Sequence, residues 1–289
     1  MTLTKTSTFF IWKGSFASNI HRSFGTVNKS ATSVTKRYPP SCQKERQVQV
    51  FGSVWEKYKG LGFKRYQDAP SHGVVMPARY FDTGDVLRST SSVPTAVLIH
   101  GSPGSVDHFS TLVDTLTENG IRVIVPSLPH PNFTFFECKH YRHSPPEKAD
   151  FVKAILQEES VKKIDCLISH SSGTFVNMEL NQDPHAPDIN SVALFHAIGD
   201  ETPGVMKPYW FIRASIKMSQ NPLLRNTLLD RVCIPILRMS GNPFARKGTG
   251  EALWGGFSMH YYNRSRVRTL KSFKLISWSA LGYFSFFSL

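Results

Sequence analysis

The sequence predicts an α/β fold in which a mostly parallel sheet carries helices on both faces. Between residues 94 and 199, short and mostly apolar runs of strand length alternate with segments of helical periodicity. This alternation is typical of a parallel sheet that is covered on both sides. One of the apolar runs, 164–168, passes directly into a small polar turn and then into a helix-compatible segment. This strand-to-helix corner is the most informative feature of the sequence for fold and function.

The elements are expected in a definite order along the chain. Residues 45–70 are expected to form a short helix that leads into the fold, and residues 73–82 one or two early strands. The Pro-Pro-Glu sequence after Ser144 suits the first turn of a helix that runs to about residue 156. The remaining expected strands are 94–100, 122–126, 164–168 and 191–199, and the remaining helices are 106–119 and 174–181.

The charge of the chain is concentrated at its two ends. The formal net charge is +13, but residues 1–44 hold seven Lys or Arg and residues 252–289 hold five, and neither segment contains Asp or Glu. Residues 45–251 therefore carry 22 basic against 21 acidic side chains. A nearly neutral middle argues against a nucleic-acid partner, because a nucleic-acid-binding domain normally presents a basic surface. The four cysteines are too widely spaced for a metal site, and no cofactor is expected.

The first 44 residues have the composition of a mitochondrial transit peptide. They are rich in Ser and Thr, and Phe9, Trp12, Phe16, Ile20 and Phe24 recur at helical spacing beside basic residues. Lys13 interrupts the apolar run that a secretory signal would need. A disordered basic tail is the remaining alternative. With the targeting interpretation, the protein is expected in the mitochondrial matrix or at the inner-membrane surface.

The turn at residues 169–173 has the pattern small-His-Ser-x-Gly, with Ser171 at its centre. A serine at a sharp strand-to-helix corner is exposed for attack, and small residues two positions away on either side let the strand and the helix approach. The first small position is Ser169 rather than glycine, and the second is Gly173. The pentapeptide alone fits a nucleophile elbow or a plain polar loop.

A second motif favours the elbow. The apolar run 94–99 ends in His100-Gly101-Ser102-Pro103-Gly104 before a helix-compatible segment. The two motifs in this order of strands and helices resemble the α/β-hydrolase superfamily over residues 94–200. The resemblance implies a sheet with a helical lid, and a serine nucleophile at position 171. Epoxide hydrolase and dehalogenase relatives share the His-Gly-x-Pro-Gly loop, but they need an aspartate at the elbow, so Ser171 argues against them.

The resemblance also assigns the groups that would stabilise a developing oxyanion. The backbone N–H groups of Ser102 and Ser172 would donate to it, and Gly101 and Gly104 would let the loop backbone come close. Such a donor is worth roughly 10²- to 10³-fold in rate. The family order then requires an acid and a histidine after the nucleophile.

The base and the acid are harder to find in the sequence. His260 is the only histidine late enough for the family order, since His185 lies in a surface-type turn and His196 inside an expected strand. Asp200 directly follows the last clear strand, a position that some superfamily members use for the acid. The run 232–244 resembles the penultimate strand and its turn, but Phe244 stands where an aspartate is expected. Alternatively, residues 201–268 are all lid.

The C-terminal part departs from the family pattern. An aromatic and basic segment at about 201–231 is interpreted as the lid, although ordinary surface helices fit as well. Residues 269–289 contain no acid and many aromatics. The apolar stretch at its end is shorter than the roughly 20 residues that a spanning helix needs. The tail is therefore either an interfacial anchor that contacts a membrane surface or an atypical, truncated C-terminus.

Two functions remain open at this stage. The first is a serine hydrolase that cleaves a carboxylic ester, thioester or amide through an acyl-Ser171 intermediate, with His260 and Asp200 as the candidate base and acid. Its substrate is expected to be a small molecule with an apolar acyl group, because aromatics gather in the lid segment and at residues 133–136. The alternative is a non-catalytic or truncated α/β-hydrolase-like protein without a complete triad.

Overall fold

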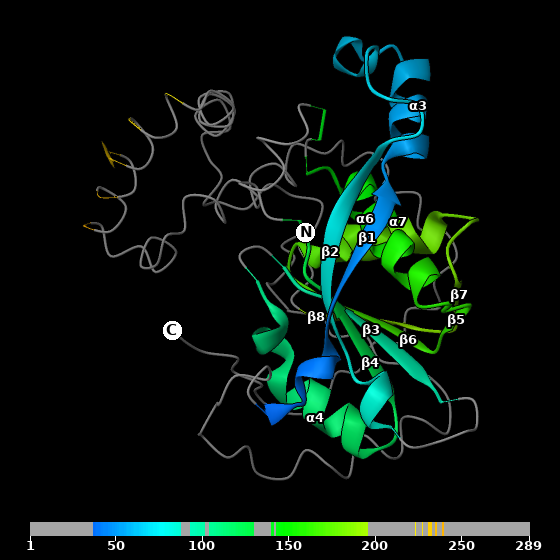
Figure 1. The fold of residues 1–289 in the computed structure, drawn as a ribbon, viewed down its shortest axis with the longest axis vertical. Coiled ribbons are helices and arrows are strands. Elements are labelled where there is room, and N and C mark those ends of the chain that lie inside the picture. The colour runs from blue at the N-terminus through cyan, green and yellow to red at the C-terminus, as the bar shows by residue number, and fades with distance from the viewer. Residues whose placement is uncertain are drawn as a thin grey trace, which may run out of the picture.

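The fold was analysed in a computed structural model of the chain (Figure 1). The structure describes residues 37–87, 93–101, 104–129, 140–141 and 143–195, together with six single positions between 223 and 239. Most of the expected leader, the expected lid and the tail at 269–289 therefore lie outside the described residues, as do Ser102, Asp200 and His260. In the part of the chain that is described, no helix is long and apolar enough to cross a membrane.

Six strands form one mixed sheet in the order β1-β2-β4-β3-β6-β8. The strands β3, β4, β6 and β8 are parallel, whereas β2 pairs antiparallel with both β1 and β4. A separate parallel pair is formed by β5 and β7. The strands are β1 Gln43–Val50, β2 Val74–Asp82, β3 Thr95–Ile99, β4 Arg122–Pro126, β5 Lys163–Ile164, β6 Cys166–His170, β7 Asp188–Ile189 and β8 Val192–Phe195. This sheet and its helices confirm the α/β-hydrolase-like fold class.

Helices cover both faces of the sheet (Figure 1). The α-helices are α3 Gly52–Gly60, α4 Ser110–Glu118, α6 Pro145–Glu158 and α7 Gly173–Gln182. Short 3-10 helices are η1 Pro40–Cys42, η2 Lys64–Tyr66, η3 Gly84–Val86 and η4 Val106–Phe109. The helix α4 lies on one face, and α6 and α7 lie on the other. In the chain order β3-α4-β4-α6-β6, the connections therefore change from one face of the sheet to the other at β4.

The burial of β3 explains why the central strands are so apolar. All five of its residues are buried. Because side chains alternate along a strand, Val97 and Ile99 join the core under α6 and α7, whereas Ala96 and Leu98 join the core under α4. A strand that is covered on both faces favours apolar side chains, and β3 confirms the strand predicted from the apolar run 94–100; Thr95, at its start, is the one polar residue in it.

The start of α6 follows the prediction from Ser144 and the two prolines. The Ser144 hydroxyl accepts a hydrogen bond from Glu147 N–H (3.4 Å), and the Glu147 carboxylate accepts one from Ser144 N–H (2.9 Å). This reciprocal pair satisfies two backbone donors that the first helical turn would otherwise leave open. Pro145 at the first helical position needs no partner for a backbone N–H. The helix is therefore fixed at the end that faces the candidate site.

The helix expected from residue 45 was wrong at its start. Residues 43–50 form the strand β1, and the helix α3 begins only at Gly52. Val48 and Val50 are buried while Gln47 and Gln49 are exposed, so the apolar residues follow the period of two that a strand requires. The folded part of the chain also begins before residue 45, because β1 already includes Lys44.

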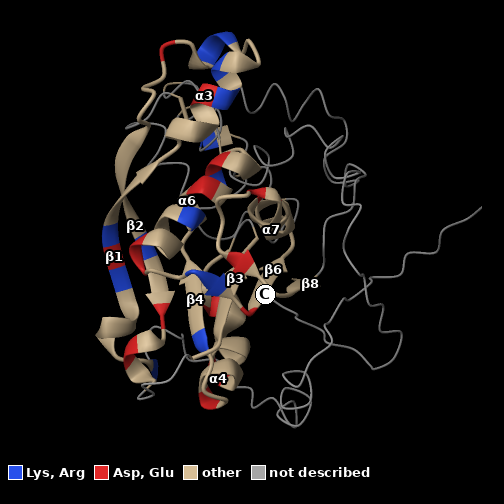
Figure 2. Ribbon diagram, turned by 90° about the vertical axis from the view of Figure 1, so that its right-hand side faces the viewer, with Lys and Arg blue, Asp and Glu red and all other residues tan. Residues whose placement is uncertain are grey.

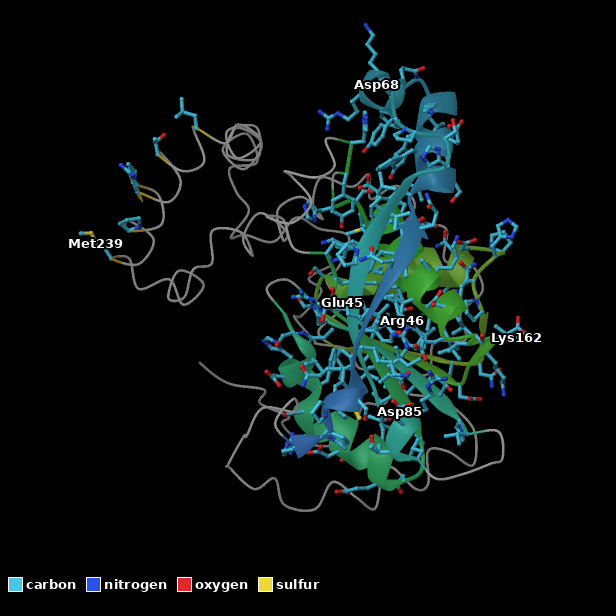
Figure 3. The ribbon with its side chains drawn as sticks, in the orientation of Figure 1. Glu45, Arg46, Asp68, Asp85, Lys162 and Met239 are labelled. Carbon is cyan, nitrogen blue, oxygen red and sulfur yellow. The ribbon has the colours of Figure 1, made fainter. Side chains whose placement is uncertain are left out.

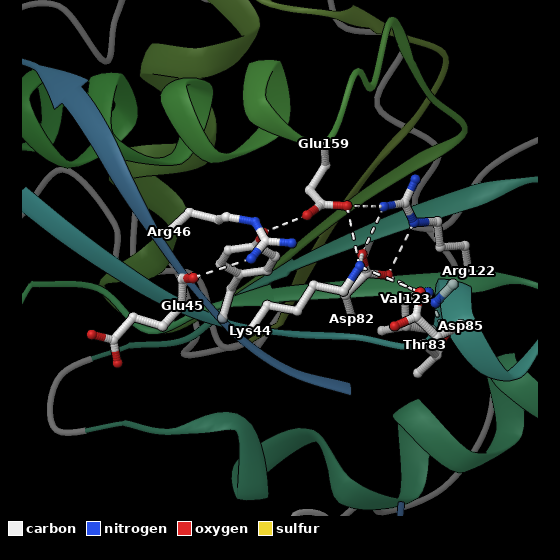
Figure 4. A network of polar contacts seen from close by, with 11 residues as sticks. Lys44, Glu45, Arg46, Asp82, Thr83, Asp85, Arg122, Val123 and Glu159 are labelled. Atoms are coloured by element: carbon white, nitrogen blue, oxygen red, sulfur yellow. Dashed lines mark hydrogen bonds and ion pairs between the residues drawn. The ribbon is translucent and has the colours of Figure 1, made fainter. Parts of the chain in front are cut away.

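A buried ionic network holds β1, β2, β4 and the end of α6 together (Figure 4). The Asp82 carboxylate is fully buried and accepts hydrogen bonds from Arg122 Nη2 (2.6 Å) and Lys44 Nζ (3.1 Å). Both cations also contact Glu159, at 2.8 Å and 3.3 Å. Hydrogen bonds from Arg122 help to hold the pKa of Asp82 below its usual range against the effect of burial. The network holds these strands together at the end of the sheet opposite to the loop that follows β3.

The strand β1 is an edge of the sheet and is charged on its exposed side. Figure 3 labels Glu45 and Arg46 on this strand, and both are exposed. Charged side chains on an edge strand discourage pairing with another chain. Figure 2 shows blue and red segments alternating on β1, in agreement with the near balance of charge in the middle of the sequence.

Candidate active site

Ser171 lies at the corner between β6 and α7, at the end of an interior strand of the sheet. The strand β6 pairs with β3 on one side and with β8 on the other. The backbone φ of Ser171 is 52°, in the left-handed region that residues with a side chain rarely adopt. Such a residue costs on the order of 1 kcal/mol or more and persists only where its surroundings hold it. A strained serine at a strand-to-helix corner is the geometry that a nucleophile elbow requires.

Two backbone hydrogen bonds hold the strained residue in place. Ser171 N–H donates to the carbonyl of Phe195, at the end of β8 (2.9 Å), and Thr174 N–H donates to the carbonyl of Ser171 (3.1 Å). The first bond ties the corner to the neighbouring strand, and the second closes the turn into α7. The side chain of Ser171 is partly exposed. The serine is therefore fixed by its backbone while its hydroxyl is left accessible.

Ser169 and Gly173, the small residues on either side of Ser171, make different contacts that require a small side chain. A Cβ on Gly173 would lie 2.6 Å from the carbonyl oxygen of Ile99 and 2.7 Å from that of His100. Only glycine therefore lets α7 pack this closely against the end of β3. Ser169 is fully buried, and its hydroxyl accepts a hydrogen bond from Asn177 Nδ2 of α7 (3.1 Å). The serine that replaces the usual glycine thus forms a tie between the strand and the helix.

The loop after β3 approaches the elbow closely. A Cβ on Gly101 would lie 2.8 Å from the Cβ of Ser171 and 3.3 Å from its Oγ. A Cβ on Gly104 would lie 2.5 Å from the carbonyl oxygen of Gly101. The two glycines therefore let the loop fold tightly over itself and beside the serine. Ser102, the residue between them that the resemblance names as a donor, lies outside the described residues.

The buried side chain of His100 holds this loop in place through two hydrogen bonds. Its Nε2 accepts a hydrogen bond from Leu128 N–H, beyond the end of β4 (3.2 Å), which leaves the proton on Nδ1. Nδ1–H then donates to the carbonyl of Gly101 (2.7 Å). Burial lowers the pKa of His100 to about 4, and the charge of Lys148 contributes in the same direction. The ring therefore stays neutral at neutral pH and serves to position the loop.

The backbone N–H of Ser172 lies at the N-terminal end of α7. Among the described residues it has no hydrogen-bond acceptor, and it precedes the first residue of α7. The N-terminal end of a helix carries a partial positive charge that favours an anion. An oxygen that becomes negatively charged beside Ser171 would meet this donor, so the arrangement can stabilise an oxyanion.

The described residues bring the serine, one donor and the glycine loop together, but they do not place a base or an acid beside Ser171. Asp200 and His260 lie outside them. His185 is exposed in the turn after α7, at the opposite end of that ten-residue helix from Ser171. A ten-residue helix is about 15 Å long, so His185 is far from the hydroxyl.

Lys148, on the first turns of α6, is not among the site residues predicted from the sequence. This side chain is only 3% exposed, and its charge acts on His100. A sequence signal was present, because Lys148, Val152 and Ile155 recur at the spacing of one helical face. Val152 and Ile155 are fully buried, so the same face carries the lysine into the interior.

Comparisons with known proteins agree with this fold. The family model described as "Alpha/beta hydrolase of unknown function (DUF1057)" matches residues 64–187. This segment includes both glycine-containing loops and the whole of α7. No curated protein matches the sequence.

Several solved structures resemble the chain at low identity. Epoxide hydrolase CorEH is 14% identical, with a TM-score of 0.45 over 76% of this chain and 75% of that one. Haloalkane dehalogenase DbeA from Bradyrhizobium elkani is 15% identical, with a TM-score of 0.41 over 75% and 68%. A carboxylesterase structure from the thaumarchaeon Nitrososphaera gargenis is 18% identical, with a TM-score of 0.40 over 63% and 65%.

Proposed function

We propose that this α/β-hydrolase fold belongs to a serine hydrolase, in which Ser171 attacks the carbonyl carbon of an ester, thioester or amide. The observation that supports this proposal most strongly is the strained backbone of Ser171 (φ 52°) at the end of the interior strand β6, beside the loop at Gly101. The side chain at this corner decides the reaction. A serine hydroxyl forms an acyl-enzyme with carbonyl substrates, whereas hydrolysis of an epoxide or a haloalkane on this fold would need a carboxylate there.

The reaction would proceed in two stages at this serine. As Ser171 Oγ bonds to the acyl carbon, the carbonyl oxygen becomes negatively charged and is stabilised by Ser172 N–H. The alcohol, thiol or amine then leaves, and water hydrolyses the acyl-Ser171 ester to release the acid. His260 and Asp200 remain the proposed base and acid for moving the serine proton. His100 takes no proton in this scheme, because its ring is already committed to Leu128 and Gly101.

Hydrolysis of p-nitrophenyl esters of increasing acyl length tests the proposal. We expect the full chain to hydrolyse the esters, and Ser171→Ala to lower kcat by about 10³-fold or more. Ser127→Ala, which removes an exposed hydroxyl after β4, serves as the control and should retain full activity. A folded wild-type protein that hydrolyses none of the esters would favour the alternative, an α/β-hydrolase-like protein without catalysis.

A further inference from the structure

Lys148 is a buried cation beside the loop that approaches the candidate nucleophile. It is the fourth residue of α6, and only 3% of its surface is exposed. The helix follows β4, which is parallel to β3, so the first turns of α6 lie at the same end of the sheet as His100 and Gly101. The charge of Lys148 contributes to lowering the pKa of His100, the residue that precedes Gly101.

The ammonium group has no counterion in the described part of the chain. None of the hydrogen bonds or ion pairs of the described residues includes Lys148 Nζ, and the only charge that favours its protonated form is that of the neighbouring Glu147. The carboxylate of Glu147 is already committed, since it accepts hydrogen bonds from Trp55 Nε1 (3.0 Å) and from the hydroxyl of Ser144 (2.9 Å). Within the described residues, the lysine is thus a positive charge without a counterion, a group that proteins rarely bury.

The position of Lys148 adds to the cost of its charge. Burial lowers the pKa of Lys148 to about 7, well below its usual value. The first turns of a helix also carry a partial positive charge, which disfavours a cation there. Two titratable groups interact electrostatically with Lys148, namely Glu147 on its own helix and His100 at the end of β3, and His100 is neutral at neutral pH. A bound anion would relieve all of these unfavourable contributions together.

We propose that Lys148 binds a carboxylate group of the substrate, so that the protein acts on acyl compounds that carry a free carboxylate in addition to the bond that is cleaved. This inference rests on the proposed function, and it names the substrate class of the same site. One ammonium group balances one carboxylate, whereas a dianionic phosphate would leave a negative charge in the interior. The N-terminal backbone donors of α6 are occupied by the Ser144 cap, so they offer no second anchor for a phosphate.

A thermal-shift experiment on the full chain with Ser171→Ala tests binding without turnover. Butyrate is the probe, its neutral analogue butyramide is the ligand control, and NaCl keeps the ionic strength constant. We expect a saturable rise in Tm of about 3–5 °C at a tenfold excess of butyrate over its Kd, and no rise with butyramide. Inorganic phosphate should give a smaller rise than butyrate. Equal responses to butyrate and butyramide, or a larger response to phosphate, would overturn the inference.

Two lysine variants show whether the effect depends on position 148. Lys148→Met keeps the length and the apolar stem of the side chain, so it should remove the butyrate response. Without butyrate, its Tm should equal or exceed that of the parent protein, because an unpaired buried charge has been removed. Lys162→Met removes the same charge from an exposed site (Figure 3) and should leave the response unchanged. A butyrate response that persists in Lys148→Met would refute the assignment.

Activity measurements on protein with Ser171 intact distinguish a failure of this inference from a failure of the proposed function. The half-ester mono-p-nitrophenyl glutarate carries a free carboxylate, and p-nitrophenyl butyrate does not. Lys148→Met should raise KM for the half-ester about tenfold or more, with little change for the neutral ester. If both esters are hydrolysed but respond equally to the substitution, the carboxylate site is wrong and the hydrolase proposal stands. If butyrate binds while neither ester is hydrolysed, the hydrolase proposal fails and the anion site stands.

Discussion

Replacing His100 with leucine should destabilise the fold and slow the reaction at Ser171. Leucine has a similar volume but cannot bond to Leu128 N–H or to the carbonyl of Gly101, which His100 now contacts at 3.2 Å and 2.7 Å. Leaving a buried donor or acceptor without a partner costs about 1–3 kcal/mol for each group. The free energy of unfolding should therefore fall by about 2–5 kcal/mol, measured by urea denaturation at pH 7.

The pH dependence of the free energy of unfolding provides a second, independent test of the role of His100. The pKa of His100 is lowered by burial from 6.5 to about 4, so the unfolded chain binds the proton more tightly. The stability that the neutral ring contributes is present above pH 6.5 and is lost as the pH falls towards 4. Between pH 7 and pH 5, the wild type should lose about 2 kcal/mol through this residue, and His100→Leu should not.

The difference in stability between the wild type and His100→Leu should therefore narrow by about 2 kcal/mol at pH 5. His185→Leu is the matched control, because this exposed ring should change the stability by less than about 0.5 kcal/mol. A difference between wild type and His100→Leu that is the same at both pH values would refute a buried, neutral His100.

Three further substitutions test other contacts of the site and its support. Gly173→Ala should lower the free energy of unfolding by about 1–3 kcal/mol in urea, since its Cβ would overlap backbone oxygens that cannot rotate away. Asp82→Asn should cost about 3–5 kcal/mol in the same assay, because it leaves Arg122 without its buried partner, and less of this loss should remain at pH values low enough to protonate the wild-type carboxylate. Ser169→Ala removes the acceptor of Asn177 Nδ2, which should cost about 1 kcal/mol and reduce hydrolysis of p-nitrophenyl esters by displacing the elbow; a variant with unchanged stability would contradict this tie.

The central sheet could be predicted from the sequence because its strands are buried on both faces. Residues 95–99 and 123–126 form short, mostly apolar runs that are buried throughout, and only Arg122, at the start of β4, is partly exposed. The edge strand β1 was misread because its exposed face is polar, and only the buried residues Val48 and Val50 show the period of two. Single-sided burial gives a weaker signal than burial on both faces.

The candidate site could be predicted where it consists of local backbone geometry. Ser171 and Gly173 stand at positions that the corner itself dictates, so a five-residue pattern was enough to locate them. The role of the His100 ring could not be predicted, because its second partner is Leu128, 28 residues further along the chain. The burial of Lys148 depends on how α6 packs against the sheet. Contacts between distant segments of the chain therefore supply what the motifs leave out.

The most direct test of the central claim is labelling of the full chain with a fluorophosphonate probe, read by intact mass. An activated serine hydroxyl is phosphonylated, whereas ordinary serine hydroxyls are weak nucleophiles at neutral pH. If Ser171 is the nucleophile, we expect a single adduct on the wild type and none on Ser171→Ala. Absence of an adduct on folded wild-type protein, or an adduct that persists in Ser171→Ala, would contradict the assignment of Ser171 as the nucleophile.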